Sequence, residues 1–85
     1  MEGIVDFCKD ESAVDDVFVV TQQGQKKQRT TTVGWWLLIQ WKDGKESWVP
    51  LKDLKESHPV ELAKFAKARA IQDEPAFAWW VPYTL

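Results

Sequence analysis

Few residues of this chain could support acid–base or nucleophilic chemistry. His58 is the single histidine and Cys8 the single cysteine. A general base needs a nucleophile or substrate group within hydrogen-bonding reach and usually an orienting partner, and the residues around His58 offer neither. We expect His58 to cap a helix instead. The adjacent acids Asp15-Asp16 and Asp73-Glu74 fit solvated faces or helix ends better than a catalytic pair.

Cofactor and metal chemistry is excluded on similar grounds. One cysteine and one histidine cannot build a Cys/His zinc cluster or an iron–sulfur site, and no internal disulfide can form. No glycine-rich phosphate loop or nucleophile elbow occurs. The sequence therefore predicts a protein that is not an enzyme and that has no cofactor and no bound metal.

Aromatic side chains are the remaining candidates for chemistry. The 85 residues include six tryptophans and four phenylalanines. Each buried aromatic removes roughly 150–250 Å² from water, so a handful can stabilise a small domain. Exposed aromatic faces, in contrast, attract cations and stack on planar ligands. Binding rather than catalysis is the function that this composition favours.

Charge is unevenly distributed along the chain. The net charge is −2, residues 1–16 are strongly acidic, and residues 25–29 form a basic island without an acid. An acidic chain is a poor non-specific DNA binder, although a local basic patch can contact phosphate. We expect a solvated loop over residues 22–29, and the alternative nucleic-acid contacts would be Lys26, Lys27 and Arg29.

A β-hairpin is the clearest structural signal. Two apolar runs flank Asp43-Gly44, which favours a two-residue type I′ turn. That turn would pair Ile39 with Trp48 and place both on one face with Trp35 and Leu37. Because both faces of the hairpin are largely apolar, we expect each face to be covered.

The other elements follow from local pattern. Strands are expected at residues 15–21, 30–42 and 45–49, with Gly34 at a bend, and Leu51 to Leu54 should form a turn. Pro59 should begin a helix that runs to Ala70, with Leu62, Phe65 and Ala66 as its apolar stripe. The predicted fold class is α+β: a small, curved, three-stranded antiparallel sheet of the chromodomain or SH3-like barrel kind, with a C-terminal helix and an extended aromatic tail.

The predicted organisation has three parts. Residues 1–14 are an acidic arm, within which residues 1–12 are either frayed or a short first strand; residues 15–71 are the folded module, and residues 72–85 an apolar extension. Because Pro75 and Pro82 exclude a continuous helix there, we expect an extended tail. Its apolar side chains must dock, so Ala76 to Thr84 should pack on its own domain or on a second copy, burying Trp79 or Trp80. No secretion signal or membrane span is apparent, which suggests an intracellular, nuclear or cytoplasmic, protein.

Residues 17–68 resemble the chromodomain family. The resemblance rests on Trp41-Lys42 at the end of one strand, Ser47-Trp48-Val49-Pro50 in the next, and Asp53-Leu54 after it. Chromodomains add an extended histone tail as a strand and hold methyl-lysine in an aromatic cage, because a quaternary ammonium is attracted to π-faces. The resemblance implies Phe18 and Trp41 as cage walls. The third wall is missing; Trp35, Trp36 or an aromatic residue of the tail would have to supply it, and Trp36 is our candidate.

A longer resemblance covers Thr30 to Leu85. The segments Thr-Thr-Thr-Val-Gly-Trp, Ile-Gln-Trp-Lys-Asp-Gly and Asp-Glu-Pro-Ala-Phe-Ala-Trp-Trp-Val-Pro are similar to the region between integrase and reverse transcriptase in copia-type retrotransposon polyproteins. This implies a fragment or domesticated relative of such a polyprotein without either enzyme's catalytic residues.

Three functions remain open from the sequence. The first is a non-catalytic, chromodomain-like module that binds a peptide or protein, with a histone tail in chromatin as a candidate. The second is a nucleic-acid-binding small barrel of the integrase C-terminal type. The third is a structural spacer that forms a homodimer through the C-terminal aromatic segment.

Overall fold

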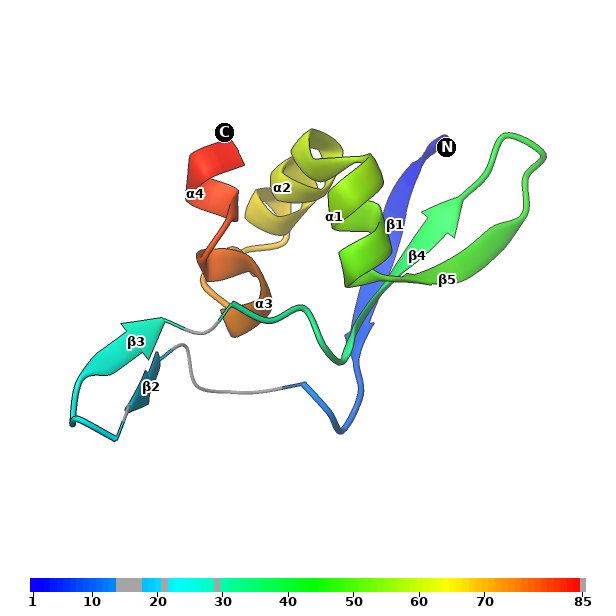
Figure 1. Ribbon diagram of the computed structural model, residues 1–85. Coiled ribbons are helices and arrows are strands. Elements are labelled where there is room, and N and C mark those ends of the chain that lie inside the picture. The colour runs from blue at the N-terminus through cyan, green and yellow to red at the C-terminus, as the bar shows by residue number, and fades with distance from the viewer. Residues whose placement is uncertain (14–17, 21, 29, 85) are drawn as a thin grey trace.

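The fold is α+β, with helices packed on one face of an open three-stranded antiparallel sheet (Figure 1). The computed structural model describes residues 1–13, 18–20, 22–28 and 30–84. The sheet has the order β1 (Gly3–Lys9), β4 (Trp35–Gln40), β5 (Glu46–Pro50). Strands β2 (Phe18–Val20) and β3 (Lys26–Gln28) form a separate hairpin. The helices are α1 (Leu51–Ser57), α2 (Pro59–Ala68), α3 (Pro75–Ala78) and α4 (Val81–Thr84). The predicted α+β class with a three-stranded antiparallel sheet is confirmed.

The strand that completes the sheet comes from the N-terminal segment and not from residues 15–21. Strand β1, the short first strand that was one alternative for residues 1–12, pairs with β4 from Gly3↔Gln40 to Lys9↔Trp35, with a bulge between Ile4 and Asp6. Residues 18–20, from the predicted first strand, form β2 and pair with β3 instead. Residues 26–28 are thus a strand rather than a loop. The Ile4 and Phe7 side chains explain the choice, because both pack against the core.

The β4–β5 hairpin has a different register from the predicted one. Trp41 N–H donates to Lys45 O at 2.8 Å, which closes a three-residue loop with Gly44 at φ 86°. A type I′ turn needs positive φ at Asp43 as well, and Asp43 does not adopt it. Trp48 therefore pairs with Leu38 rather than Ile39. Its side chain lies on the face away from the core and is 46% exposed, so the predicted burial of Trp48 is wrong.

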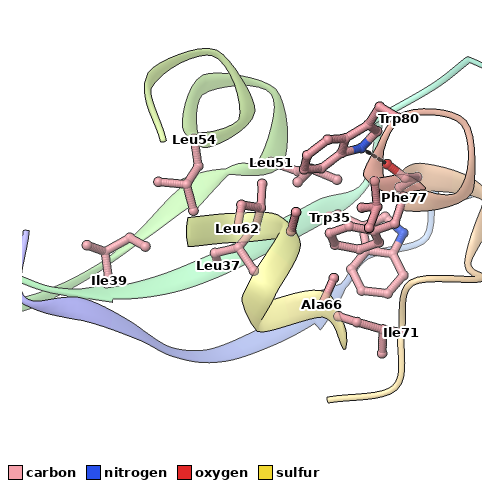
Figure 2. Packing of buried hydrophobic residues seen from close by; sticks show 13 residues of the cluster. Trp35, Leu37, Ile39, Leu51, Leu54, Leu62, Ala66, Ile71, Phe77 and Trp80 are labelled. Atoms are coloured by element: carbon pink, nitrogen blue, oxygen red, sulfur yellow. Dashed lines mark hydrogen bonds between the residues drawn. The ribbon is translucent and has the colours of Figure 1, made fainter. Parts of the chain in front are cut away.

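The core lies between the sheet and the helices (Figure 2). Strand β4 contributes Trp35, Leu37 and Ile39, and its alternation of buried and partly exposed residues follows the period of a strand. Helices α1 and α2 cover this face. The expected stripe of α2 is confirmed: Leu62 and Ala66 are buried and Phe65 is partly buried. The other buried members are Leu51, Leu54, Ala63, Ile71, Ala76, Phe77, Trp80 and Val81.

The C-terminal segment folds back onto its own domain, as predicted. Trp80 is 5% exposed, and the Phe77 ring meets the Trp35 ring edge-on with centroids 5.0 Å apart. The expectation of an extended conformation is wrong, because Pro75 starts the short helix α3 and α4 follows it. Proline at a first helical position is compatible with such a turn. The Trp80 indole N–H donates to Ala76 O at 2.8 Å within this segment.

Residues 51–57 form helix α1 where a turn was expected. Leu51 and Leu54 lie one turn apart and are both buried, which anchors the helix to the core. Helix α2 begins at Pro59 as predicted and ends at Ala68, before the positive φ of Ala70. Within the described parts of the chain, no helix has the length and apolar character needed to cross a membrane.

Candidate functional site

The sheet face opposite the helices, here called the outer face, carries an apolar strip. Strand register places Trp36, Leu38 and Trp48 side by side on it, with Cys8 next to Trp36 on β1. Cys8 is exposed, Trp48 is half exposed, and Trp36 and Leu38 are partly exposed. The expectation that both faces are covered is wrong for the described residues, because the helices all pack on the other side (Figure 1).

Trp36 is held at one end of this strip by an acid. Its indole N–H donates to Asp10 Oδ2 at 3.0 Å. Asp10 Oδ1 accepts the backbone N–H of Ser12 at 2.8 Å and also the Ser12 hydroxyl. Hydrogen bonds from Ser12 and then from Trp36 lower the pKa of the Asp10 carboxyl below its ordinary value of 3.8. The group is therefore a carboxylate at neutral pH, oriented beside an aromatic ring.

Gly34 fixes the position of this acid. Asp10 N–H donates to Gly34 O at 2.8 Å, and Gly34 has φ 89°. A Cβ on Gly34 would lie 2.6 Å from Ala13 Cα and closer still to Ala13 N. The 10–13 turn can therefore approach the start of β4 only because residue 34 has no side chain. Gly34 therefore lies in a closely packed turn just before β4, in agreement with the bend expected there.

A hollow of about 300 Å³ opens beside Trp36 and Asp10. It is lined by Asp10, Ser12, Thr32, Val33, Gly34, Trp35, Trp36, Pro50 and Lys52. Through Thr32 and Lys52 it adjoins a second hollow of about 210 Å³ that Lys55 and Trp79 also line. We call these two hollows together the Trp36–Trp79 groove. Asp10 thus lines the first hollow and Lys55 and Glu56 line the second, while Lys52 lines both.

The lysine end of the groove is ordered by aromatic rings. Lys55 Nζ lies 4.8 Å from the centroid of the Trp79 ring and 5.5 Å from that of Trp80. Trp79 is itself fixed, because its indole N–H donates to Thr31 O at 3.1 Å. Cation–π contacts of this kind attract a lysine to a ring face without neutralising its charge. Lys52 is exposed beside them.

The predicted cage walls do not lie together. Trp41 follows β4 at the β4–β5 turn, whereas Phe18 belongs to β2 in the separate hairpin at the opposite end of the molecule (Figure 1). The Trp41 indole N–H donates to Ser47 Oγ at 2.7 Å, and the side chain is 38% exposed. Of the three aromatic candidates, Trp36 is the one that the structure places in a hollow with a carboxylate.

The residues proposed for nucleic-acid contact lie partly outside the described chain. Lys26 is exposed in β3, and Lys27 is its neighbour in the same strand. Arg29 is outside the described residues. The β2–β3 hairpin extends away from the helices and the three-stranded sheet in Figure 1.

His58 sits where the sequence placed it, but its side chain does not cap α2. It is the N-cap residue by position, without a side-chain capping bond. Its Nδ1 lies 2.9 Å from Ser57 Oγ, and that hydroxyl is within hydrogen-bonding distance of Asp53 O at 3.0 Å. Serine hydroxyls near a helix end commonly bond to the carbonyls of the preceding turn in this way. Within the described part of the chain, no three His, Cys, Asp or Glu residues are grouped to hold a metal ion.

Comparison with family models, curated proteins and solved structures finds no match to this chain. The site is therefore interpreted from its own geometry. Sequence reasoning missed Asp10 and Ser12. The available signal was Asp10 two residues before Ser12, since an aspartate that bonds the backbone two residues on is typical of a turn.

Proposed function

We propose that this chain is a non-catalytic binding module for an extended peptide of a protein partner, and that the Trp36–Trp79 groove receives a cationic side chain of that peptide. The observation that carries the proposal is the bond between the Trp36 indole and the Asp10 carboxylate beside an open hollow. The chromodomain-like and copia-type resemblances suggest a histone tail in the nucleus as a candidate peptide.

The chemistry of the groove supports a cationic ligand at the Asp10 end. A lysine or methyl-lysine head group over the Trp36 ring gains a cation–π contact, and the neighbouring carboxylate adds Coulomb attraction. Asp10 already accepts three donors, so it acts mainly as a fixed charge rather than as a free acceptor. Such a site tolerates a quaternary ammonium, which cannot donate a hydrogen bond.

The second hollow carries charges of both signs. Lys52 is exposed and Lys55 is held on Trp79, and both offer contacts to a carboxylate further along the same peptide, beside the Glu56 side chain that lines the same hollow. We therefore expect the selectivity for a cationic side chain to come from the Trp36 ring and the Asp10 carboxylate.

Peptide titration tests the proposal. Lysine-containing histone-tail peptides, unmodified and trimethylated, are titrated into the protein while tryptophan fluorescence and amide NMR shifts are followed. We expect the trimethylated peptide to bind more tightly, and Trp36→Ala and Asp10→Asn each to weaken it by roughly five-fold or more, since a cation–π contact contributes about 1 kcal/mol. Trp41→Ala is the matched control and should retain binding.

Two results would contradict this proposal. One is equal affinity of the Trp36→Ala variant and the parent for every peptide. The other is a set of NMR shifts confined to Trp41 and the β4–β5 turn, which would restore Trp41 as the binding aromatic. Correct folding of each variant is checked by circular dichroism beforehand.

A nucleic-acid-binding role is the second candidate. The β2–β3 hairpin favours it, because this hairpin projects from the rest of the structure in Figure 1 and contains Lys26, which is exposed, and Lys27 in one strand. A Lys26→Glu, Lys27→Glu double variant should then abolish binding to a DNA or RNA oligonucleotide, with affinity falling steeply as salt increases. Oligonucleotide binding that survives the double variant would count against this role.

A further inference from the structure

Among the described residues, strand β5 has no partner strand along one of its backbone edges. It is the last strand in the order β1-β4-β5, and Trp41 N–H bonds to Lys45 O at its start. In an antiparallel ladder, residues alternate between bonding to the neighbouring strand and pointing their backbone groups outward. The outward groups of β5 are therefore the N–H and C=O of Glu46 and Trp48 and the C=O of Pro50. Pro50 has no N–H to offer.

The opposite edge of the sheet is guarded. In β1, the bulge after Ile4 interrupts pairing, and Arg69 Nη2 donates to Val5 O at 2.8 Å. Arg69 also lies 3.9 Å from Asp6. Bulges and charged side chains are the usual means by which an edge strand avoids pairing with another chain. Strand β5 has no bulge in its pairing with β4, and a half-exposed tryptophan occupies its centre.

We propose that β5 pairs antiparallel with β5 of a second copy of this chain, across a two-fold axis at Trp48, so that two sheets become one. Each Trp48 then exchanges N–H···O bonds with Trp48 of the other copy, and each Glu46 N–H bonds the Pro50 carbonyl of the other copy. Because Pro50 has no N–H, the Glu46 carbonyl of the other copy receives no bond in this register. The other outward groups of β5 are all paired. A two-fold arrangement uses the same surface on both copies.

Side-chain complementarity selects this register. Centring the axis on Trp48 places the two indoles opposite each other on the outer face, where aromatic cross-strand pairs are favourable. Glu46 lies beside Pro50 of the other copy, and Lys52 is the next charged residue along that chain. Centring the axis on Ser47 would instead set each indole against the charged Glu46 of the other copy.

The contact is small, and this determines its strength. Stable protein interfaces bury roughly 1,200–2,000 Å², which two five-residue strands and an indole pair do not reach. The dimer is therefore weak and concentration-dependent. It also differs from dimerisation through the C-terminal aromatic segment, because Phe77 and Trp80 of that segment are buried in their own domain.

Sedimentation equilibrium over a wide concentration range tests the pairing. A reductant is included because Cys8 is exposed. We expect the mean mass to rise from 9.9 kDa towards twice that value. Glu46→Pro removes an outward N–H but no bond to β4, and Trp48→Lys sets like charges opposite each other; both should remain monomeric. Tyr83→Lys, at an 86% exposed aromatic on α4, is the control that should still dimerise.

Amide hydrogen exchange locates the contact. At high concentration, the Trp48 and Glu46 amides of the parent should become protected, while those of β1 should not change. A parent that is monomeric at every concentration overturns the inference, as does a dimer that persists in Trp48→Lys. Because Trp36→Ala should leave the mass unchanged, failure of the peptide-binding proposal and failure of the dimer are separate results.

Discussion

Replacing Phe77 by alanine tests whether the C-terminal segment is part of the core. The Phe77 side chain is 0% exposed, and the centroid of its ring lies 5.0 Å from that of Trp35 and 6.0 Å from that of Trp80. A buried phenylalanine removes roughly 150–250 Å² from water, or about 4–6 kcal/mol at ~25 cal/mol per Å². The alanine side chain still buries part of this area, so we expect Phe77→Ala to lower the free energy of unfolding by about 3–5 kcal/mol. The total free energy of unfolding of a chain of this length is about 4–13 kcal/mol.

Urea and thermal unfolding, followed by far-UV circular dichroism and tryptophan fluorescence, measure this loss. We expect the melting temperature of Phe77→Ala to fall by more than about 10 °C, since ~1 kcal/mol shifts it by roughly 4–8 °C in a domain of this size. Tyr83→Ala is the matched control, because Tyr83 is an exposed aromatic of the same segment and should cost less than about 0.5 kcal/mol. If the two variants unfold at the same temperature, the docking of residues 75–84 onto the sheet is wrong.

Three further predictions concern the groove and the guarded edge. Gly34→Ala should lower the free energy of unfolding by at least about 1–2 kcal/mol because of the positive φ at this residue alone. It should also displace the 10–13 turn, which would shift the NMR signal of the Trp36 indole N–H. An unchanged signal would contradict the close packing of Gly34 on Ala13. Because the pKa of Asp10 is lowered in the folded state, its hydrogen bonds to Ser12 and Trp36 should be fully formed at pH values above its ordinary pKa of 3.8. They should be lost as the pH falls through the lower pKa of the folded state. An NMR titration of Asp10 with a midpoint at or above pH 3.8 would refute this. Arg69→Ala should cost about 1 kcal/mol by removing the bond to Val5 O and should promote association through β1, whereas Arg69→Lys should partly preserve both; the check is unfolding together with sedimentation.

Local pattern was sufficient to predict several elements. The α+β class, the β4–β5 hairpin, the start of α2 at Pro59 and its buried Leu62 and Ala66 follow from alternation, turn residues and a proline at a first helical position. The apolar composition of the tail predicted that it docks, either on its own domain or on a second copy, and the structure shows the first of these. These features depend on neighbours in sequence, or on the general cost of exposing apolar side chains, so the sequence contains their causes.

The binding groove could be predicted only in part. Trp36 was a candidate from its aromatic ring, but its partner Asp10 lies 26 positions earlier in the chain. Their contact requires β1 to pair with β4, which also brings the 10–13 turn onto Gly34. Whether β1 or residues 18–20 form the third strand depends on how the Ile4 and Phe7 side chains fit the core. This fit cannot be predicted from the local sequence.

The two faces of the β4–β5 hairpin also separate what the sequence determines from what the tertiary structure determines. The sequence by itself determined that residues 35–50 form a hairpin with tryptophans on both faces. The tertiary structure decided that the Trp35 face meets the helices and that Trp48 points outward, because the loop contains three residues and shifts the register by one. A shift of one residue moves a side chain to the other face of a sheet. Sequence therefore determined the composition of the two faces, and three-dimensional packing determined which tryptophans remained exposed.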